Sequence, residues 1–410
     1  MTQGTAIIDA PRLVHVTTVP MTLSFLVRQV AHAKRQGFDV HAVSAPDADL
    51  AEFGARAQIP VHELAMARRI TPLRDLAALW RMRRILRSIK PDIVHGHTPK
   101  GGLLAMMGAW WCGVPVRIYH VHGLPMVTAT GMKRRLLRLA EKTSCRLATQ
   151  VLCVSESVRD VVIAEGLCPP EKIKVLLNGT IDGIDGEHTF NPDLVDANAR
   201  YDIRQLHGIP ADAAVIGFAG RIVRDKGVIE LTQAWQKLRV EFPTAHLLVV
   251  GPFEEHDPLP ADIERFLRED SRIHLAGRIP SSAMSLYYRA MDVLALPTYR
   301  EGFNTVLLEA AAMELPTVAS RVPGCVDGIV DGETGTLIPS HDSTALVSAL
   351  RRYLADPELR RQHGTAGRAR VLCDFRPEDI SEATLQEYQR LLAGTRLAQH
   401  SHPDLVSHKG

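Results

Sequence analysis

The chain of 410 residues is long for one hydrophobic core and comfortable for two domains, and its 46% hydrophobic and 23% charged residues are typical of a folded soluble protein. Its six cysteines show no CxxC spacing, which argues against a thiolate metal site and favours buried thiols in a reducing cytosol. The net charge of +2 conceals an asymmetry: residues 1–200 hold 25 Lys+Arg and 18 Asp+Glu (net +7), whereas residues 201–410 hold 23 and 28 (net −5).

The first residues, MTQGTAIIDAPR, lack the basic and long apolar regions of a secretory signal. Short β-rich runs then alternate with segments of helical spacing, and this alternation predicts βαβ units around a parallel sheet. The expected strands of the first half are residues 13–18, 39–45, 93–97, 116–122, 150–155 and 173–179. Helical spacing covers 73–89 and 131–148. The apolar run 101–116 is shorter than the roughly 20 residues of a membrane span and predicts a buried helix.

The stretch 178–199 is rich in Gly, Asn and Asp and shows no apolar period, which indicates a connection between domains. Beyond it the alternation restarts, with strands expected at 214–220, 246–251, 272–277, 293–298, 316–322 and 335–339. We therefore predict an α/β fold of two doubly wound, Rossmann-like parallel-sheet domains that face a cleft. The boundaries are 11–190 for the first domain, 191–208 for the linker and 209–378 for the second domain. A helix at 379–394 is expected to cross back to the first domain, and residues 395–410 are expected to be disordered.

The basic charge concentrates between Arg68 and Arg146, where 16 Lys and Arg residues stand against three acidic ones. Such a field attracts polyanions, and the candidates are an anionic lipid surface, a phosphorylated acceptor or nucleic acid. Nucleic acid is disfavoured because no series of stacking aromatic residues or recognition motif accompanies the charge. Arg134, Arg135 and Arg138 beside three leucines favour a membrane interface, and the alternative is a solvated basic face without a partner.

Polar residues follow the expected strands at the points where α/β sheets bind ligands. In FAGRIVRDKG, Gly220 lets the backbone approach a ligand, Arg221 offers a planar fork for phosphate oxygens, and Lys226 adds a point charge. A diphosphate suits this pair. The alternative is a surface ion pair with Asp225 or another carboxylate.

The stretch REGFNTVLLEAAAMELP carries two glutamates, Glu301 and Glu309, whose spacing is not that of helical partners. We predict that Asn304 or Thr305 caps a helix, that Glu301 precedes it, and that Glu309 lies inside it. The open amides from Phe303 to Thr305 would then face an anion, with hydroxyl groups bound by a glutamate at each end. The alternatives are that Glu301 acts as a cap or forms an ion pair with Arg300 or Arg321, and that Glu309 is merely solvated.

Two HxH pairs, His95 with His97 and His120 with His122, lie near the ends of expected strands. Alternate strand residues share a face, so each pair could suggest zinc, but no Cys or carboxylate supports it at a suitable spacing. We expect no metal site. His122 is better placed as a hydrogen-bonding residue of the cleft, and Lys100 as support for an acceptor phosphate.

Three motifs in this order, HG at His122, GRxxxxKG from Gly220 and EGFxxxxxE from Glu301, resemble the retaining nucleotide-sugar glycosyltransferases of family 4, which have the GT-B fold. The resemblance runs from about Pro11 to Leu392. It implies that Arg221 and Lys226 hold the donor diphosphate, Glu301 the donor sugar and Glu309 the ribose. His122 would lie beside the reacting sugar. The implied substrate contacts also include Gly220, Ile279, Phe303, Asn304 and Thr305.

The family retains anomeric configuration without metal or cofactor, by attack from the face of the departing diphosphate. On this mechanism Arg221 and Lys226 stabilise the leaving group, and Glu301 positions the sugar. One departure is the first loop, where Val19, Pro20, Met21 and Thr22 replace the glycine pair of many members. The resemblance therefore does not extend to donor contacts from this loop.

The segments VTTVPMTLSF, HTPKGGLLA and NGTIDGID resemble the bacterial enzymes that build capsule, O-antigen or undecaprenyl-diphosphate-linked oligosaccharides. This implies a UDP-linked N-acetylhexosamine or hexose donor, a lipid-diphosphate-linked glycan acceptor and a cytoplasmic protein held on the inner membrane face. The alternatives are a UDP-N-acetylglucosamine 2-epimerase of the same fold and a non-catalytic nucleotide-sugar-binding protein. A Rossmann oxidoreductase is disfavoured because no GxGxxG follows the first strand.

Overall fold

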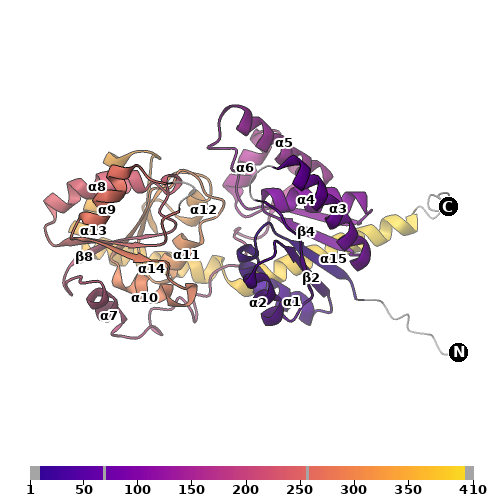
Figure 1. Ribbon diagram of the computed structural model, residues 1–410. Coiled ribbons are helices and arrows are strands. Elements are labelled where there is room, and N and C mark those ends of the chain that lie inside the picture. The colour runs from indigo at the N-terminus through magenta and orange to yellow at the C-terminus, as the bar shows by residue number, and fades with distance from the viewer. Residues whose placement is uncertain (1–9, 68–70, 255–257, 402–410) are drawn as a thin grey trace. The chain divides into compact units, whose positions relative to one another are not determined.

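The computed structural model describes residues 10–67, 71–254 and 258–401 and divides them into two compact units (Figure 1). The first unit contains the residues up to Leu177 together with those from Glu378 onward, and the second contains Asn178–Pro377. Each unit is built on one parallel β-sheet flanked by helices. The expected α/β architecture with two parallel sheets is confirmed.

The first unit has a seven-stranded sheet in the order β3-β2-β1-β4-β5-β6-β7. Its strands are β1 (Arg12–Val16), β2 (Asp39–Ser44), β3 (Val61–Glu63), β4 (Ile93–His97), β5 (Val116–Val121), β6 (Gln150–Cys153) and β7 (Ile173–Val175). Its helices are α1 (Val27–Arg35), α2 (Ala48–Ala57), α3 (Pro72–Ile89), α4 (Pro99–Trp111), α5 (Gly131–Leu147), α6 (Glu156–Ala164) and most of α15 (Pro377–Ser401), with 3₁₀ turns η1 (Pro20–Leu26) and η2 (Pro170–Lys172). Six of these strands were expected from the sequence, and the short edge strand β3 was not.

The second unit has a six-stranded sheet in the order β10-β9-β8-β11-β12-β13. Its strands are β8 (Ala214–Ala219), β9 (Ala245–Val250), β10 (Ile273–Gly277), β11 (Val293–Leu296), β12 (Thr317–Ser320) and β13 (Gly335–Ile338). Its helices are α7 (Ala199–Leu206), α8 (Val228–Glu241), α9 (Ala261–Glu269), α10 (Met284–Ala290), α11 (Thr305–Ala312), α12 (Cys325–Gly328), α13 (Ser343–Ala355) and α14 (Pro357–Asp374), with 3₁₀ turns η3 (Arg224–Lys226) and η4 (Ser281–Ala283).

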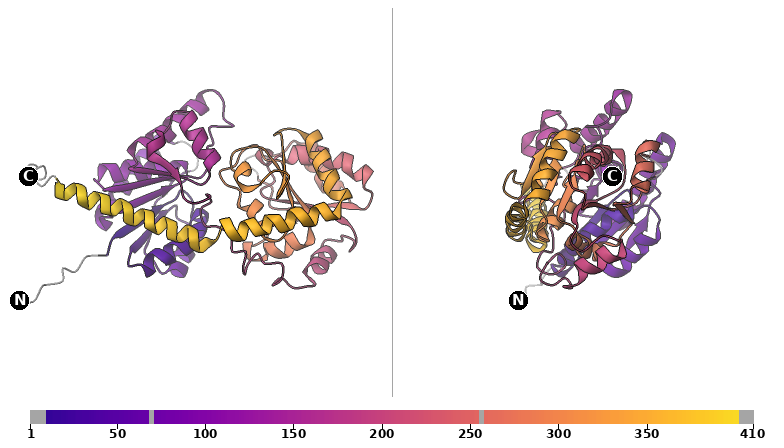
Figure 2. Two further views of the ribbon diagram at one scale, coloured as in Figure 1. Left: turned by 180° about the vertical axis from the view of Figure 1, so that it is seen from behind. Right: turned by 90° about the vertical axis from the view of Figure 1, so that its left-hand side faces the viewer.

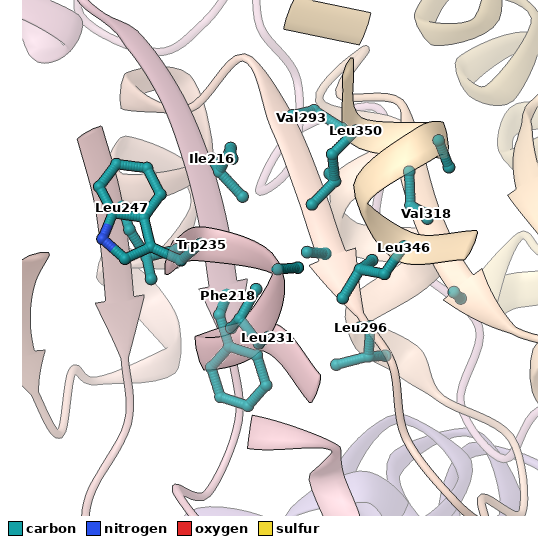
Figure 3. Packing of buried hydrophobic residues seen from close by; sticks show 14 of the residues in the cluster. Ile216, Phe218, Leu231, Trp235, Leu247, Val293, Leu296, Val318, Leu346 and Leu350 are labelled. Carbon is teal, nitrogen blue, oxygen red and sulfur yellow. The ribbon is translucent and has the colours of Figure 1, made fainter. Parts of the chain in front are cut away.

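Alternation of side chains along the strands gives the second sheet a hydrophobic core on each face. Ile216 and Phe218 of β8 point to one face, where they pack with Trp235 of α8 and Leu346 of α13 (Figure 3). Val215 and Ala219, on the opposite face of the same strand, belong to the core under α7, α10, α11 and α14. Both faces of a parallel sheet are covered in this way, which explains the continuous apolar runs of its strands.

The structure corrects the predicted domain boundaries. The predicted linker, residues 191–208, lies within the second unit, because α7 supplies Ile203 to the same core as Phe190 and Ile209. The first unit ends at Leu177 instead of residue 190. The polar composition of residues 191–208 therefore indicates a surface segment that packs on the second sheet, not a connection between the units.

The chain returns to the first unit at Glu378, where α15 runs along it (Figure 2). The expected helix 379–394 is longer at both ends and continues to Ser401. The prediction of disorder from residue 395 is wrong as far as Ser401, and residues 402–410 lie outside the described part.

The apolar run 101–116 also differs from its prediction. Helix α4 begins at Pro99 and ends at Trp111, after which Gly113, with φ of 70°, turns the chain into β5. Much of the helix is buried, but Trp110 and Trp111 are exposed. Of the six cysteines, Cys112 is half-buried and Cys373 is exposed, while the other four are buried. Among the described residues, no helix combines the length and apolar character needed to cross a membrane.

Candidate active site

The second sheet places two of the predicted motifs at one point. The chain moves outward from β8 to β9 and β10, then returns to the other side of β8 as β11. The loops after β8 and β11 therefore diverge at a topological switch point, where open α/β sheets bind ligands. The first loop carries Gly220, Arg221 and Lys226, and the second carries Glu301.

Lys226 and Glu301 form an ion pair at this switch point. Nζ of Lys226 donates to Oε1 of Glu301 at 2.6 Å, and the two side chains are 17% and 11% exposed. The predicted alternative of a pair between Glu301 and Arg300 or Arg321 is wrong, since Arg300 pairs with Asp225 and Arg321 with Asp331. The structure thus brings together two residues that the resemblance assigned to diphosphate and sugar.

Further hydrogen bonds join the two loops. Nε of Arg300 donates to the Asp225 carboxylate at 2.9 Å, and the Asp225 carbonyl accepts from Thr298 Oγ1 at 3.0 Å. Gly227, with φ of 70°, lies so close to β11 that a Cβ atom would stand 1.9 Å from the carbonyl oxygen of Pro297. A glycine is needed here for both conformation and space. These contacts fix the position of Lys226 relative to Glu301.

The loop after Glu301 ends in a capped helix, as predicted. Asn304 is the N-cap of α11, and its Oδ1 accepts from the Val306 amide at 3.1 Å, whereas Thr305 is the first helical residue. Among the residues that the structure describes, the amides of Phe303, Asn304 and Thr305 donate to no protein acceptor. Nδ2 of Asn304 is buried without a partner in the same part of the chain. Four donors are therefore available at a helix N-terminus, where an anion is favoured.

Glu309 lies inside α11, as predicted, but it is not merely solvated. Tyr288 of α10 donates its hydroxyl to Oε2 of Glu309 at 2.7 Å. Burial raises the pKa of Glu309, and this hydrogen bond opposes the rise. The carboxylate is thus held in one orientation with its other oxygen available as an acceptor.

Two other predicted residues of the second unit lie differently. Arg221 is half exposed and donates to Glu254 at 3.0 Å, so the alternative of a surface ion pair describes its state in this structure, although the partner is not Asp225. Ile279 follows β10 at the edge of the sheet and packs partly buried against the core under α10. Within the described residues, neither Arg221 nor Ile279 forms a hydrogen bond or ion pair with Lys226 or Glu301.

In the first unit, His122 follows β5 and its Nε2 lies 3.0 Å from Nδ1 of His97. Lys100, in the first turn of α4, donates to Asp75 at 2.8 Å, and both side chains are largely buried. The loop after β1 is tied to the start of α4, because Thr18 Oγ1 accepts from the Gly101 amide at 2.8 Å. The unusual Pro20 begins the 3₁₀ turn η1.

Several residues of the site were missed by sequence reasoning. They are Asp225, which ties the two loops, Tyr288, which orients Glu309, and Gly324, where a Cβ atom would stand 2.5 Å from the Gly302 carbonyl oxygen. The signal for Gly324 was the PG turn in RVPGC, whereas the partners Asp225 and Tyr288 carry no local sequence signal.

The groups around the Lys226–Glu301 pair suit a particular kind of ligand. A cation and a carboxylate lie side by side, free amides stand at the next helix, and an oriented second carboxylate lies one turn further along. Such a set accepts hydroxyl groups beside an anion and stabilises negative charge on that anion. This is the chemistry of a binding site for a sugar attached to a phosphate.

Comparison with known proteins gives the same class. Residues 199–370 match the model of glycosyl transferases group 1, and residues 11–179 match a glycosyl transferase 4-like domain. The capsular polysaccharide biosynthesis glycosyltransferase CapM of Staphylococcus aureus is 32% identical over 381 residues, which cover 93% of this chain and 97% of that protein. An Escherichia coli UDP-Gal:alpha-D-GlcNAc-diphosphoundecaprenol alpha-1,3-galactosyltransferase is 26% identical over 304 residues, which cover 72% of this chain and 74% of that protein.

Solved structures agree on the fold. Anabaena HepE in complex with UDP and glucose aligns with a TM-score of 0.78 at 18% identity, covering 93% of this chain and all of that one. A sucrose-phosphate synthase from Thermosynechococcus elongatus gives the same TM-score at 22% identity, with coverage of 94% and 100%. The fold is therefore the GT-B fold of glycosyltransferases. The chain belongs to the group 1 glycosyltransferases of family 4, as its motifs indicated.

Proposed function

We propose that this glycosyltransferase moves a hexose or N-acetylhexosamine from a UDP-sugar to a polyprenyl-diphosphate-linked glycan, with retention of anomeric configuration. The product would enter a bacterial surface polysaccharide. The names of the capsular and undecaprenol-linked relatives support the acceptor class. The basic first unit, which suits an anionic acceptor, supports it independently.

The observation that carries the proposal is the 2.6 Å contact between Lys226 and Glu301. A ligand that engages both residues must present an anion and a hydrogen-bond donor next to each other. A sugar bonded directly to a diphosphate does so, because its hydroxyl groups donate to Glu301 while the phosphate oxygens accept from Lys226. The amides at Phe303, Asn304 and Thr305 supply further donors for the same anion.

In the proposed reaction, the bond between the anomeric carbon and the diphosphate oxygen breaks while the acceptor oxygen bonds to that carbon on the same face. The acceptor proton passes to the departing phosphate oxygen. Arg221, Lys226 and the helix amides supply the positive charge that stabilises the leaving group, so the proposal assigns no step to a metal. Glu309 would hold the ribose, and His122 would contact the sugar from the first unit.

The first unit offers a surface for peripheral attachment to the cytoplasmic membrane face. Exposed apolar side chains form helical stripes on α3 and α5, and Trp110 and Trp111 end the helix α4 that packs between them. The stripes consist of Leu73, Leu76 and Trp80 on α3 and of Met132, Leu136 and Leu139 on α5. We call Leu73, Leu76, Trp80, Trp110 and Trp111 the tryptophan face. Tryptophan beside basic residues is typical of protein surfaces at a membrane interface.

The structure changes which residues of α5 we assign to this attachment. Arg134 and Arg138 pair with Glu165, and Leu137 packs against the hydrophobic core. The guanidinium of Arg83 on α3 lies 4.5 Å from the ring centre of Trp111 and 5.4 Å from that of Trp80. The attachment therefore rests on α3 and α4 as much as on α5.

The test is a donor and acceptor panel followed by mass spectrometry. The purified protein is incubated with UDP- and GDP-sugars, each with and without a prenyl-diphosphate glycan. We expect one UDP-sugar to add one sugar mass to the acceptor, and the anomeric configuration of the product is then read by NMR. Conversion of a UDP-sugar to its epimer without acceptor, or transfer from no donor, would contradict the proposal.

A further inference from the structure

One face of the first sheet carries a cluster of five histidines. In register, His15 of β1 pairs with His95 of β4, and His97 of β4 pairs with His120 of β5. His122 falls on the same face by alternation. The first four are at most 6% exposed, and the opposite face at these positions belongs to the apolar core. A cluster of titratable groups this deeply buried must have every ring in a defined protonation state.

Three of these rings form a chain. Nε2 of His97 lies 3.1 Å from Nδ1 of His15, and Nδ1 of His97 lies 3.0 Å from Nε2 of His122. Both nitrogens of His97 are therefore engaged. At the inner end, Nε2 of His15 is buried and has no partner within the described residues.

The rings of the chain are neutral at physiological pH. Burial lowers the pKa of His15 and of His122 to about 4 and holds the pKa of His97 well below its usual value. A neutral imidazole has one N–H donor and one acceptor nitrogen. If Nδ1–H of His15 donates to Nε2 of His97, then Nδ1 of His97 carries the proton and donates to Nε2 of His122. The tautomer of His15 therefore determines the tautomer of His122.

Nε2 of His15, which has no partner within the described residues, determines the direction of donation along the chain of rings. A buried N–H group without an acceptor is rarer and more costly than a buried acceptor without a donor. Nε2 of His15 is therefore the unprotonated nitrogen, and Nδ1–H of His15 donates to Nε2 of His97. We propose that His15 and His97 are positioning residues that hold His122 as the Nδ1–H tautomer, so that it meets the substrate as a neutral hydrogen-bond donor. The substrate contact of His122 rests on the proposed function, whereas the tautomer does not.

The remaining histidines provide a control and a rival explanation. Nδ1 of His95 lies 2.7 Å from the Tyr388 hydroxyl of α15, and Nε2 of His95 lies 3.2 Å from His120, so this second chain does not end on His122. The alternative explanation is a divalent metal ion, because nitrogens of His15, His95 and His97 lie within 4.8 Å of one another, as do those of His97, His120 and His122. A metal would take a nitrogen from each ring and break the pairwise hydrogen bonds, which is why we favour the chain.

Ring-nitrogen NMR of the protein labelled with ¹⁵N-histidine tests the tautomer directly. The signals of His122 are assigned by their loss in His122→Asn. We expect Nδ1 to carry the proton and Nε2 to be the acceptor in the unliganded wild type. A proton on Nε2, or a doubly protonated ring near neutral pH, would overturn the proposal.

Variants test the dependence on His15. In His15→Leu we expect a mixture of His122 tautomers and a loss of up to about tenfold in kcat with little change in KM. His15→Asn, whose amide can donate to His97, should restore the single tautomer. Tyr388→Phe removes a hydrogen bond from the same histidine face and should leave the His122 signals unchanged. An unaltered tautomer in a folded His15→Leu variant would contradict the chain.

Metal analysis of the protein purified without chelator distinguishes the hydrogen-bonded chain from a metal site. About one bound ion per chain that is absent from His97→Leu, which removes the histidine shared by both groups, would replace the proposal by a metal site. Because the NMR result needs no turnover, its outcome is independent of the proposed function. The Nδ1–H tautomer in a protein that transfers no sugar would refute only the function, and transfer by a protein with the other tautomer would refute only the chain.

Discussion

Nζ of Lys226 lies 2.6 Å from Oε1 of Glu301, although 75 residues separate them in the chain. The contact neutralises both charges in the unliganded protein. On the proposed function, a donor sugar exchanges this ion pair for its own contacts: its hydroxyl groups bind Glu301 and its diphosphate binds Lys226. The pair keeps each residue oriented for that exchange.

Replacement of Glu301 should abolish most transfer while the fold remains. In Glu301→Gln the amide oxygen still accepts from Lys226, but the negative charge that orders the sugar hydroxyls is gone. We expect a loss of about 100-fold or more in kcat/KM, measured by product mass. Glu333→Gln, an exposed glutamate of the same unit, is the control. Equal activity in the two variants would exclude Glu301 from the site.

Arg221 should contribute to donor binding and little to stability. The side chains of its ion pair with Glu254 are 51% and 31% exposed, and ion pairs this open to solvent stabilise proteins weakly. We expect Arg221→Ala to keep the melting temperature and to weaken UDP-sugar binding about tenfold or more in calorimetry. The matched control is Arg361→Ala, which breaks the exposed pair with Glu358 on α14. Unchanged affinity in Arg221→Ala would contradict the assignment to the diphosphate.

Gly227 should be far less tolerant of alanine than another glycine with positive φ. A Cβ atom at Gly227 would lie 1.9 Å from the Pro297 oxygen, whereas at Gly208, with φ of 68°, it would meet nothing within 4 Å. Gly208→Ala should lower the free energy of unfolding by about 1–2 kcal/mol, the conformational cost alone. Gly227→Ala should cost more than about 3 kcal/mol in denaturant titration. Similar values for both would mean that the loops are not packed as described.

Membrane binding should depend on the tryptophan face. Trp80 and Trp110 are 52% and 61% exposed, and each should bury its ring in the interface of anionic vesicles. We expect Trp80→Ser with Trp110→Ser to lower vesicle binding about tenfold or more in flotation, and added salt to weaken wild-type binding. Tyr201→Ser, an exposed aromatic residue of the second unit, should have no effect. Wild-type protein that fails to float with anionic vesicles would refute the attachment.

Glu141 should impose a pH dependence on stability. It is 2% exposed, accepts from the Tyr119 hydroxyl at 2.6 Å, and burial raises its pKa from 4.5 to about 7. The folded state therefore binds this proton more tightly than the unfolded state, so stability from this group falls as pH rises from about 4.5 to about 7. The shift corresponds to about 3 kcal/mol.

Glu141→Gln cannot lose a proton and should not show this fall. The free energy of unfolding of Glu141→Gln minus that of the wild type should increase between about pH 4.5 and about pH 7 and level off above it. Subtracting the two curves removes the buried histidines, which act in the opposite direction because their folded pKa values are lowered. A difference that is constant between pH 4 and pH 8 would refute the raised pKa.

Much of the fold followed from local patterns. Twelve of the strands are continuous β-rich runs between turn residues, and such runs are determined by burial on both faces of a parallel sheet. The short strand β3 was missed because three residues at a sheet edge carry too little pattern. Asn304 was predicted as a possible N-cap because capping is a contact between near neighbours in the chain. The boundary near residue 190 failed because Phe190 and Ile203 are buried by tertiary packing in a segment of polar composition.

By itself, the sequence determined which residue types follow each strand, and the order of three motifs was enough to indicate the family. Only the tertiary structure decided which of these residues meet. Lys226 pairs with Glu301, Tyr288 orients Glu309, and His97 contacts His122, because adjacent parallel strands and the helices that cover them bring distant segments to one edge. Partner choice over such distances depends on strand order and register, and no local pattern of residues encodes these.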